Sequence, residues 1–123
     1  MLANGVHHLS FTVSDLDRSR AFYEGIMGLE TVPRPDFGIG GVWYSAGNAQ
    51  IHLIELPGRE KPDTKLSPLA NHNAFAIDDY QKVLDQLKSQ AVEVLETTPE
   101  QGQMWISDPD GNIIELIAPG TMR

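Results

Sequence analysis

The sequence carries one pattern twice, and this internal repeat constrains the fold more than any other feature. Residues 8–15, HLSFTVSD, recur as residues 72–79, HNAFAIDD. Two shorter stretches recur at a similar offset, Trp43–Ser45 as Trp105–Ser107 and Ile51–Ile54 as Ile114–Ile117. A repeat of this kind predicts two copies of one supersecondary unit, each formed by about half of the chain.

Hydrophobic alternation and turn residues predict the same order of elements in both halves: a strand, a helix and three further strands. In the first half, strands are expected at residues 6–13, 29–32, 42–45 and 50–56, with a helix over 15–27 that Ser14 caps and Gly28 ends. In the second half, strands are expected at residues 71–77, 92–95, 103–107 and 112–117, with a helix over 79–89 that Asp78 caps.

The sequence therefore predicts an α+β fold of two βαβββ modules. We expect a single domain over residues 1–123, with module one at about 5–57, a linker at about 58–69 and module two at about 70–119.

Composition argues against several classes of function. The chain has 9 Lys and Arg against 17 Asp and Glu, a net charge of −8, whereas a nucleic-acid partner needs a clustered basic surface. The absence of cysteine leaves nitrogen and oxygen as the ligands for a metal. We see neither a secretory signal nor an apolar run of the roughly 20 residues that span a membrane. A cytoplasmic protein that acts on a small molecule, without nucleic acid or membrane, is therefore expected.

Metal-ligand residue types occupy matching positions in the two halves. His8 matches His72, and His52 matches Glu115. Successive side chains of a strand face opposite sides, so both first-strand histidines lie away from the large apolar residues of their strands and beside small ones. Because histidine and glutamate bind divalent metals, this pattern predicts a metal site formed by His8, His52, His72 and Glu115.

Each of these residues also has a purely structural interpretation. A single strand histidine is commonly a hydrogen-bonded structural residue, and Glu115 on an edge strand would face water. However, four isoleucine and leucine residues flank Glu115, and a carboxylate in a buried strand is costly unless it is paired or bound to a cation. His7 falls on the opposite face from His8, and we assign it a structural or supporting role.

Three stretches resemble the vicinal-oxygen-chelate superfamily, which includes glyoxalase I, methylmalonyl-CoA epimerase, fosfomycin-resistance proteins, extradiol dioxygenases and bleomycin-binding proteins. They are residues 7–23, HHLSFTVSDLDRSRAFY, residues 27–29, MGL, and residues 108–116, DPDGNIIEL. The resemblance covers essentially the whole chain. It implies the glyoxalase/bleomycin-resistance/dioxygenase fold, in which two modules form an eight-stranded half-open cup around a metal.

The resemblance also implies a ligand set and an assembly. The ligand positions of the family fall on His8, His52, His72 and Glu115. A histidine at position 52 departs from glyoxalase I, which usually has a carboxylate there, and from the epimerase, which usually has a glutamine. We expect a homodimer in which each site takes His8 and His52 from one chain and His72 and Glu115 from the other. The alternative is a monomer in which the two modules of one chain supply all four ligands.

The implied chemistry is that of a glyoxalase-like lyase or isomerase. One divalent ion per site, Zn, Ni, Fe or Mn, would leave two positions for neighbouring oxygens of a small substrate, with Glu115 as both ligand and catalytic base. Two alternatives stay open. One is an extradiol-type Fe(II) dioxygenase that uses His8, His72 and Glu115, and the other is a metal-free protein that sequesters a drug. The substrate, the metal and the chemical step also stay open.

Five further residues are candidates for contact with the substrate. Aromatic and apolar side chains are expected to line the pocket, namely Phe37, Trp43, Met104 and Trp105. Arg34, on the Pro- and Gly-rich loop 33–41, is expected to meet a substrate carboxylate or phosphate. The alternatives are core packing for the four apolar side chains and an exposed loop charge for Arg34.

Overall fold

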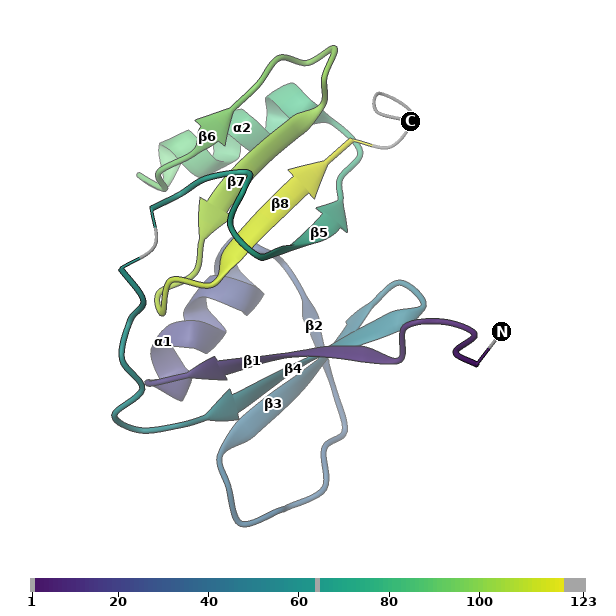
Figure 1. Ribbon diagram of the computed structural model, residues 1–123, viewed down its shortest axis with the longest axis vertical. Coiled ribbons are helices and arrows are strands. Elements are labelled where there is room, and N and C mark those ends of the chain that lie inside the picture. Colours follow the sequence, from purple (N-terminus) through teal and green to yellow (C-terminus); the bar gives the residue numbers. More distant parts are fainter. Residues whose placement is uncertain (1, 64, 119–123) are drawn as a thin grey trace. The chain divides into compact units, whose positions relative to one another are not determined.

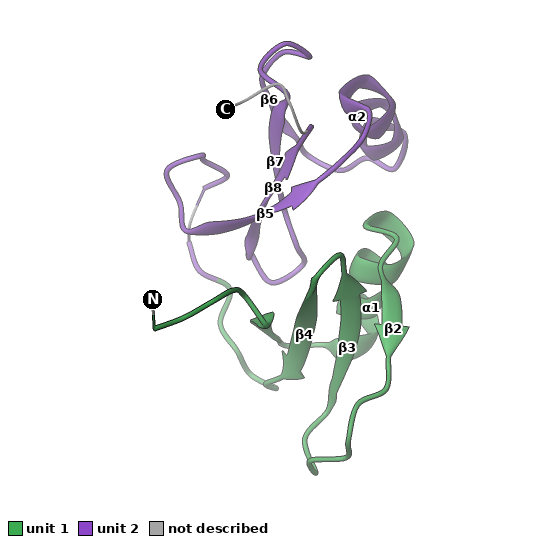
Figure 2. Ribbon diagram, turned by 90° about the vertical axis from the view of Figure 1, so that its right-hand side faces the viewer, with its two compact units in different colours: residues 1–61 green, residues 62–123 purple. Residues whose placement is uncertain are grey.

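A computed structural model describes residues 2–63 and 65–118, and the chain forms two compact units, residues 1–61 and 62–123 (Figure 2). Each unit contains one helical segment and one four-stranded sheet (Figure 1). The predicted α+β fold of two βαβββ modules is confirmed. Across the described residues, no helix combines the length and the apolar character that crossing a membrane requires.

The first unit consists of β1 (His8–Val13), a helical segment, β2 (Glu30–Val32), β3 (Gly41–Ala46) and β4 (Ala49–Glu55). The strands pair in the order β1-β4-β3-β2. β1 and β4 are parallel, and the other pairs are antiparallel. Parallel pairing requires a long connection between the two strands, which the helical segment, β2 and β3 supply.

The helical segment of the first unit differs from the prediction at its start. It begins as α1 (Leu16–Arg20) and continues as the π-helical η1 (Ala21–Ile26). Asp15, not Ser14, is the N-cap, and its carboxylate accepts a hydrogen bond at 3.1 Å from the backbone N–H three residues later. A carboxylate satisfies this free N–H and also complements the helix dipole. Gly28 ends the helix as predicted, with a φ of +72° that glycine adopts without strain.

The second unit repeats this topology. It consists of β5 (His72–Ala76), α2 (Tyr80–Ser89), β6 (Leu95–Glu96), β7 (Gln103–Ser107) and β8 (Ile113–Ile117). The strand order is β5-β8-β7-β6, with β5 and β8 parallel. In Figures 1 and 2, α2 lies along one face of this sheet. The equivalent strand orders explain why the sequence repeats at equivalent places.

Two boundaries in the second unit also differ from the prediction. Asp79, not Asp78, caps α2 through its carboxylate. The strand expected over residues 92–95 is shortened to two residues, because the chain first closes the helix end. There the N–H of Val92 donates to the carbonyl of Leu87 at 3.0 Å, which is a helix-terminal bond and not a sheet bond.

Strand register gives each sheet an apolar face and a second, functional face. In the first unit the apolar face packs on the helical segment, and the rings of Phe11, Tyr23 and Tyr44 stack there. The buried residues of this face are Phe11, Val13, Val42, Tyr44, Ile51 and Leu53. In the second unit they are Met104, Ile106, Ile114 and Leu116. All four candidate metal ligands lie on the other faces.

Candidate metal centre

Both sheets carry a tryptophan and a ligand-type side chain at equivalent points. His52 on β4 lies directly opposite Trp43 on β3, and Glu115 on β8 lies directly opposite Trp105 on β7. Paired residues of neighbouring strands project to the same side of a sheet. The same faces also carry the first-strand histidines, His8 and His72.

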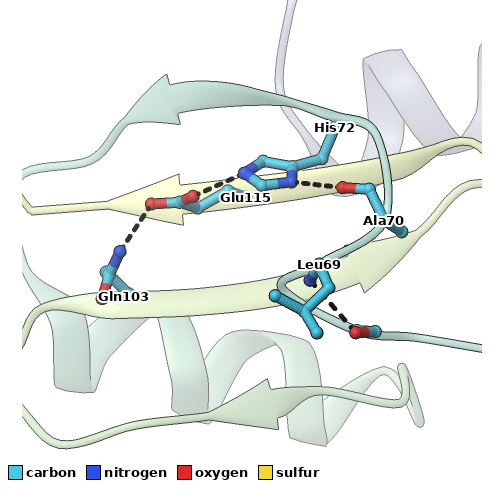
Figure 3. Close-up of polar contacts among 6 residues, drawn as sticks. Leu69, Ala70, His72, Gln103 and Glu115 are labelled. Atoms are coloured by element: carbon cyan, nitrogen blue, oxygen red, sulfur yellow. Dashed lines mark hydrogen bonds and ion pairs between the residues drawn. The ribbon is translucent and has the colours of Figure 1, made fainter.

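His72 and Glu115 form a close pair in the second unit (Figure 3). Nε2 of His72 lies 2.9 Å from Oε1 of Glu115, a residue that is only 6% exposed. The Nδ1–H of His72 donates to the backbone carbonyl of Ala70 at 2.8 Å. Because a carbonyl can only accept, this bond assigns the proton to Nδ1, and a neutral His72 directs the lone pair of Nε2 at Glu115. Gln103 donates to the other oxygen of Glu115, Oε2, at 3.2 Å.

The facing atoms of this pair are joined by a proton or by a metal ion, and the contact is an ion pair when His72 is protonated. A neutral imidazole nitrogen and a carboxylate oxygen both present lone pairs, so an approach to 2.9 Å needs a proton or a metal ion to bridge them. Two ligand atoms that each lie about 2.1 Å from one ion, at right angles, are about 3 Å apart. The spacing is that of an ordinary ion pair and also that of two neighbouring ligands of a six-coordinate divalent ion, and nitrogen and oxygen donors suit Zn, Ni, Fe or Mn.

In the first unit, three aromatic rings stack face to face. The ring centroid of His52 lies 4.1 Å from that of Trp43, at an interplanar angle of 7°. It lies 4.0 Å from that of His8, at 13°. The Nε2–H of His52 donates to Oε1 of Gln50 at 2.8 Å, and Nδ1 of His7 lies 2.8 Å from Nδ1 of His8. Stacking and two polar contacts therefore hold both imidazole rings.

The surroundings of His52 favour its neutral form. Burial lowers the pKa of His52, and the nearby His8, His7 and Arg34 lower it further. Neutral imidazole is the form that binds metals. A bound ion lies in the plane of the imidazole that holds it, so two nearly parallel rings 4.0 Å apart do not point at one ion. One ring has to turn before His8 and His52 can share an ion.

The four candidate ligands thus occur as two pairs, one in each unit. Among residues 2–63 and 65–118, no three His, Asp or Glu side chains are grouped as a metal site. The donor types of both pairs suit a divalent ion. The spacing of His72 and Glu115 suits both an ion pair and two ligands of one ion, whereas His8 and His52 are stacked and do not point at one ion.

Three aromatic or charged side chains follow one another on the first unit. The ring centroid of Phe37 lies 6.0 Å from that of Trp43. The guanidinium carbon of Arg34 lies 5.2 Å from the centroid of the Phe37 ring, which is within the range of a cation–π contact. Three of the five residues predicted to contact a substrate therefore form a continuous row that ends at His52.

The other two predicted contact residues separate onto opposite faces. Trp105 lies on the face of Glu115, and its ring meets the ring of His72 edge to face at 6.4 Å. Its Nε1 is buried and has no hydrogen-bond partner within the described chain. Met104 is fully buried opposite Leu116 on the apolar face. The expectation that Met104 lines the same surface as Trp105 is therefore corrected, because neighbouring residues of a strand project to opposite sides.

Two glutamines that the sequence motifs do not single out contact the candidate ligands. Gln103 holds Glu115, and Gln50 holds His52. A signal for both exists in strand alternation, since Gln50 lies two residues before His52 and Gln103 two residues before Trp105. The repeat does not reveal them, because neither has a glutamine at the equivalent position of the other half.

Comparisons with known proteins extend over nearly the whole chain. A sequence model of the Glyoxalase/Bleomycin resistance protein/Dioxygenase superfamily matches residues 5–116. The chain is 32% identical to a metallothiol transferase FosB of Staphylococcus epidermidis, with 100% of this chain and 87% of that protein covered. It is 30% identical to a protein of Synechocystis named Probable lactoylglutathione lyase, with 94% and 96% covered.

A solved structure shows the same fold. The glyoxalase I of Leishmania major superposes with a TM-score of 0.77 at 22% identity, and the match covers 97% of this chain and 89% of that chain.

Proposed function

Since the chain belongs to the Glyoxalase/Bleomycin resistance protein/Dioxygenase superfamily, we propose that it is a divalent-metal-dependent enzyme, a glyoxalase-like lyase or isomerase that acts on a small substrate with two neighbouring oxygens. Two relatives are named as enzymes, a metallothiol transferase and a probable lactoylglutathione lyase, which supports a catalytic function for this chain. The observation that carries the proposal is the 2.9 Å approach of His72 to Glu115.

In this proposal, His8, His52, His72 and Glu115 hold one ion per site. Burial lowers the pKa of His52 and so favours its neutral form, and the hydrogen bond to the carbonyl of Ala70 leaves Nε2 of a neutral His72 with its lone pair. A bound divalent ion would supply Lewis-acid polarisation of two neighbouring substrate oxygens. To hold the same ion, His8 and His52 would have to leave their stacked arrangement.

Glu115 is the proposed catalytic base. Its two oxygens have different surroundings, because Oε1 faces His72 and Oε2 accepts a hydrogen bond from Gln103. One oxygen can therefore act as a ligand while the other takes a proton from a substrate carbon and returns it to the neighbouring carbon. The amide of Gln103 orients Oε2 for this transfer, and Trp105 on the same face helps to exclude water.

We also propose that the functional form is a homodimer. Each site would take His8 and His52 from one chain and His72 and Glu115 from the other. Each unit contributes one pair on its functional face, and each pair alone supplies too few ligands for an enclosed site, so a complete site combines two units, which the two chains of a dimer would supply.

The test uses hemithioacetals, which form from a 2-oxoaldehyde and a thiol and carry two neighbouring oxygens. Thioester formation is followed by ultraviolet absorbance, and exchange of the carbon-bound proton with deuterium oxide is followed by NMR. We expect metal-loaded protein to catalyse the exchange and a chelator to abolish it. Glu115→Gln should lower kcat by at least about 100-fold. Rates that stay at the level of the untreated, metal-loaded wild-type protein, either with the chelator or in the Glu115→Gln variant, would contradict the proposal.

A further inference from the structure

Arg34 lies against β3 on the functional face of the first unit. A Cβ built on Gly41 would meet Nη2 of Arg34 at 2.8 Å and its Cζ at 2.9 Å. A side chain at position 41 would project to the same face as Trp43 and His52, because positions 41 and 43 alternate with position 42. The guanidinium therefore occupies the place that a β3 side chain would take, and the missing side chain of Gly41 leaves room for it.

The guanidinium of Arg34 has a buried donor that no residue within 2–63 and 65–118 accepts from. Its Nη2 donates to the carbonyl of Ile39 at 2.9 Å, which leaves its other N–H groups for further contacts. Its Nε is buried and has no hydrogen-bond partner within the described part of the chain. A buried donor without an acceptor destabilises a folded protein. An acceptor that arrives with a ligand would satisfy it.

The repeat shows what this position does in the other module. Position 41 corresponds to Gln103, whose amide donates to the carboxylate of Glu115. In the first unit, the residue equivalent to Glu115 is His52, which has no carboxylate to accept such a bond. The donor at this point is a cation instead of an amide. In the second module, the carboxylate of Glu115 accepts the hydrogen bond from this position. In the first module, His52 stands in place of that carboxylate, so the Arg34 donor stays available for an oxyanion of a ligand.

The neighbours of Arg34 place this donor beside the proposed metal ligands. The row from Arg34 through Phe37 and Trp43 reaches His52 by ring contacts of 5.2, 6.0 and 4.1 Å. Arg34 is also among the groups that lower the pKa of His52, after burial and the two neighbouring histidines. A positive charge so close to a site for substrate oxygens selects for negative charge on the same substrate.

We propose that Arg34 binds an oxyanion of the substrate, a carboxylate or a phosphate group, that is separate from the two neighbouring oxygens of the metal site. This inference rests on the proposed function, since it assigns the substrate class of that same site. Such a substrate is a small acid that binds through at least three oxygens. Two of them would bind the metal, and one or more would accept hydrogen bonds from the Arg34 guanidinium.

The experiment compares three 2-hydroxy acids that share the same chelating oxygens. Lactate has no further charge, malate adds a carboxylate and 3-phosphoglycerate adds a phosphate. Calorimetric titrations use the Zn²⁺-loaded protein and its Arg34→Gln and Arg34→Lys variants. Arg18→Gln is the matched control, because Arg18 is an exposed arginine of α1 whose removal changes the net charge equally. The thermal midpoint of each variant confirms folding.

We expect the wild-type protein to prefer malate or 3-phosphoglycerate over lactate, and whichever acid it prefers identifies the oxyanion. Arg34→Gln should reduce this preference at least about tenfold, which corresponds to one hydrogen bond to a charged group, and leave lactate binding unchanged. Arg34→Lys should retain part of the preference, since lysine keeps the charge without the planar fork. Arg18→Gln should retain all of it. An undiminished preference in folded Arg34→Gln would overturn the inference.

An NMR measurement separates this inference from the proposed function. The Nε–H signal of Arg34, identified by its absence in Arg34→Lys, should shift when malate or 3-phosphoglycerate is added and stay in place with lactate. If Zn²⁺ does not bind, the proposed function fails, yet a shift of this signal in metal-free protein still supports the oxyanion site. If Zn²⁺ and lactate bind and the signal never shifts, the inference about Arg34 alone is wrong.

Discussion

Nε2 of His72 faces Oε1 of Glu115 at 2.9 Å, while Nδ1 of the same ring is held by the carbonyl of Ala70. The carbonyl directs a lone pair, not a proton, toward the carboxylate when the ring is neutral. Two acceptors at this distance need a bridging proton or metal ion, so the contact is an ion pair when His72 is protonated, and its donor types also suit a divalent ion.

Removal of the Gln103 amide should weaken metal binding. Gln103→Leu keeps a side chain of similar size but removes the amide that donates to Oε2 of Glu115 at 3.2 Å in the wild-type protein. Partners that orient a metal ligand are typically worth about 10-fold or more in affinity, and we expect a loss of this size in competition titrations with a chromophoric chelator. Gln101→Leu changes an exposed glutamine nearby and serves as the control. Equal affinities of the two variants would contradict the orienting role.

Substitution of Gly41 should disturb both the fold and Arg34. A Cβ at this position would lie 2.5 Å from the carbonyl oxygen of Leu53 and 2.8 Å from Nη2 of Arg34. We expect Gly41→Ala to lower the free energy of unfolding by about 1–3 kcal/mol, as overpacking does. Gly25→Ala, where a Cβ meets no atom within 4 Å, should be neutral or stabilising by about 0.5–1 kcal/mol. Urea unfolding of both variants measures the difference, and similar values for the two would refute the close-packing explanation.

The metal-free protein should become less stable as the pH falls below about 6.5, the ordinary pKa of histidine. The pKa of His52 is lowered in the fold, first by burial and then by His8. The unfolded chain therefore takes up the proton before the folded chain does, and the free energy of unfolding rises with pH between the two pKa values. This contribution is complete above the unfolded pKa and is lost as the pH falls through the folded pKa.

His52→Gln should flatten this dependence. Urea unfolding at a series of pH values from about 5 to about 8 measures the slope for both proteins. The variant can be less stable throughout, since it loses the stacking on Trp43, and only the slope tests the explanation. An unchanged slope would assign the pH dependence to other groups.

Mixing two inactive variants should restore one of the two sites in every mixed dimer if the sites form between chains. One variant carries His8→Ala and His52→Ala, and the other carries His72→Ala and Glu115→Ala. A mixed dimer contains one site with all four ligands and one with none, so metal content should recover after the two proteins are unfolded and refolded together. Recovery is measured by elemental analysis against each variant refolded alone. No recovery in a mixture that does form dimers would place each site within a single chain.

Much of this arrangement is predictable because strand alternation is a strict rule. The repeat and the period of two together place His8 and His72 on the faces away from the large apolar residues of their strands, as observed. The same rule, applied to β7, separates Met104 from Trp105 and would have removed Met104 from the candidate pocket. Each helix cap lies one residue later than predicted, at Asp15 and at Asp79. Neighbouring polar residues can each cap a helix, so the pattern alone does not choose between them.

The remaining features depend on side-chain torsions and on a loop, which no periodic pattern determines. The stack of Trp43, His52 and His8 requires particular rotamers. Arg34 reaches β3 only because the loop folds back over Gly41. The change from α1 to the π-helical η1 likewise has no signal in the hydrophobic pattern.

The most direct measurement is an anomalous difference map from crystals of the Zn²⁺-loaded protein, collected at the zinc absorption edge. We expect one peak per site about 2.1 Å from Nε2 of His72 and from a carboxylate oxygen of Glu115, with a nitrogen of His8 and of His52 completing the protein ligands. A map in which zinc is absent from the His72 and Glu115 pair, or in which the pair keeps its direct hydrogen bond while zinc binds elsewhere, would contradict the proposed metal centre.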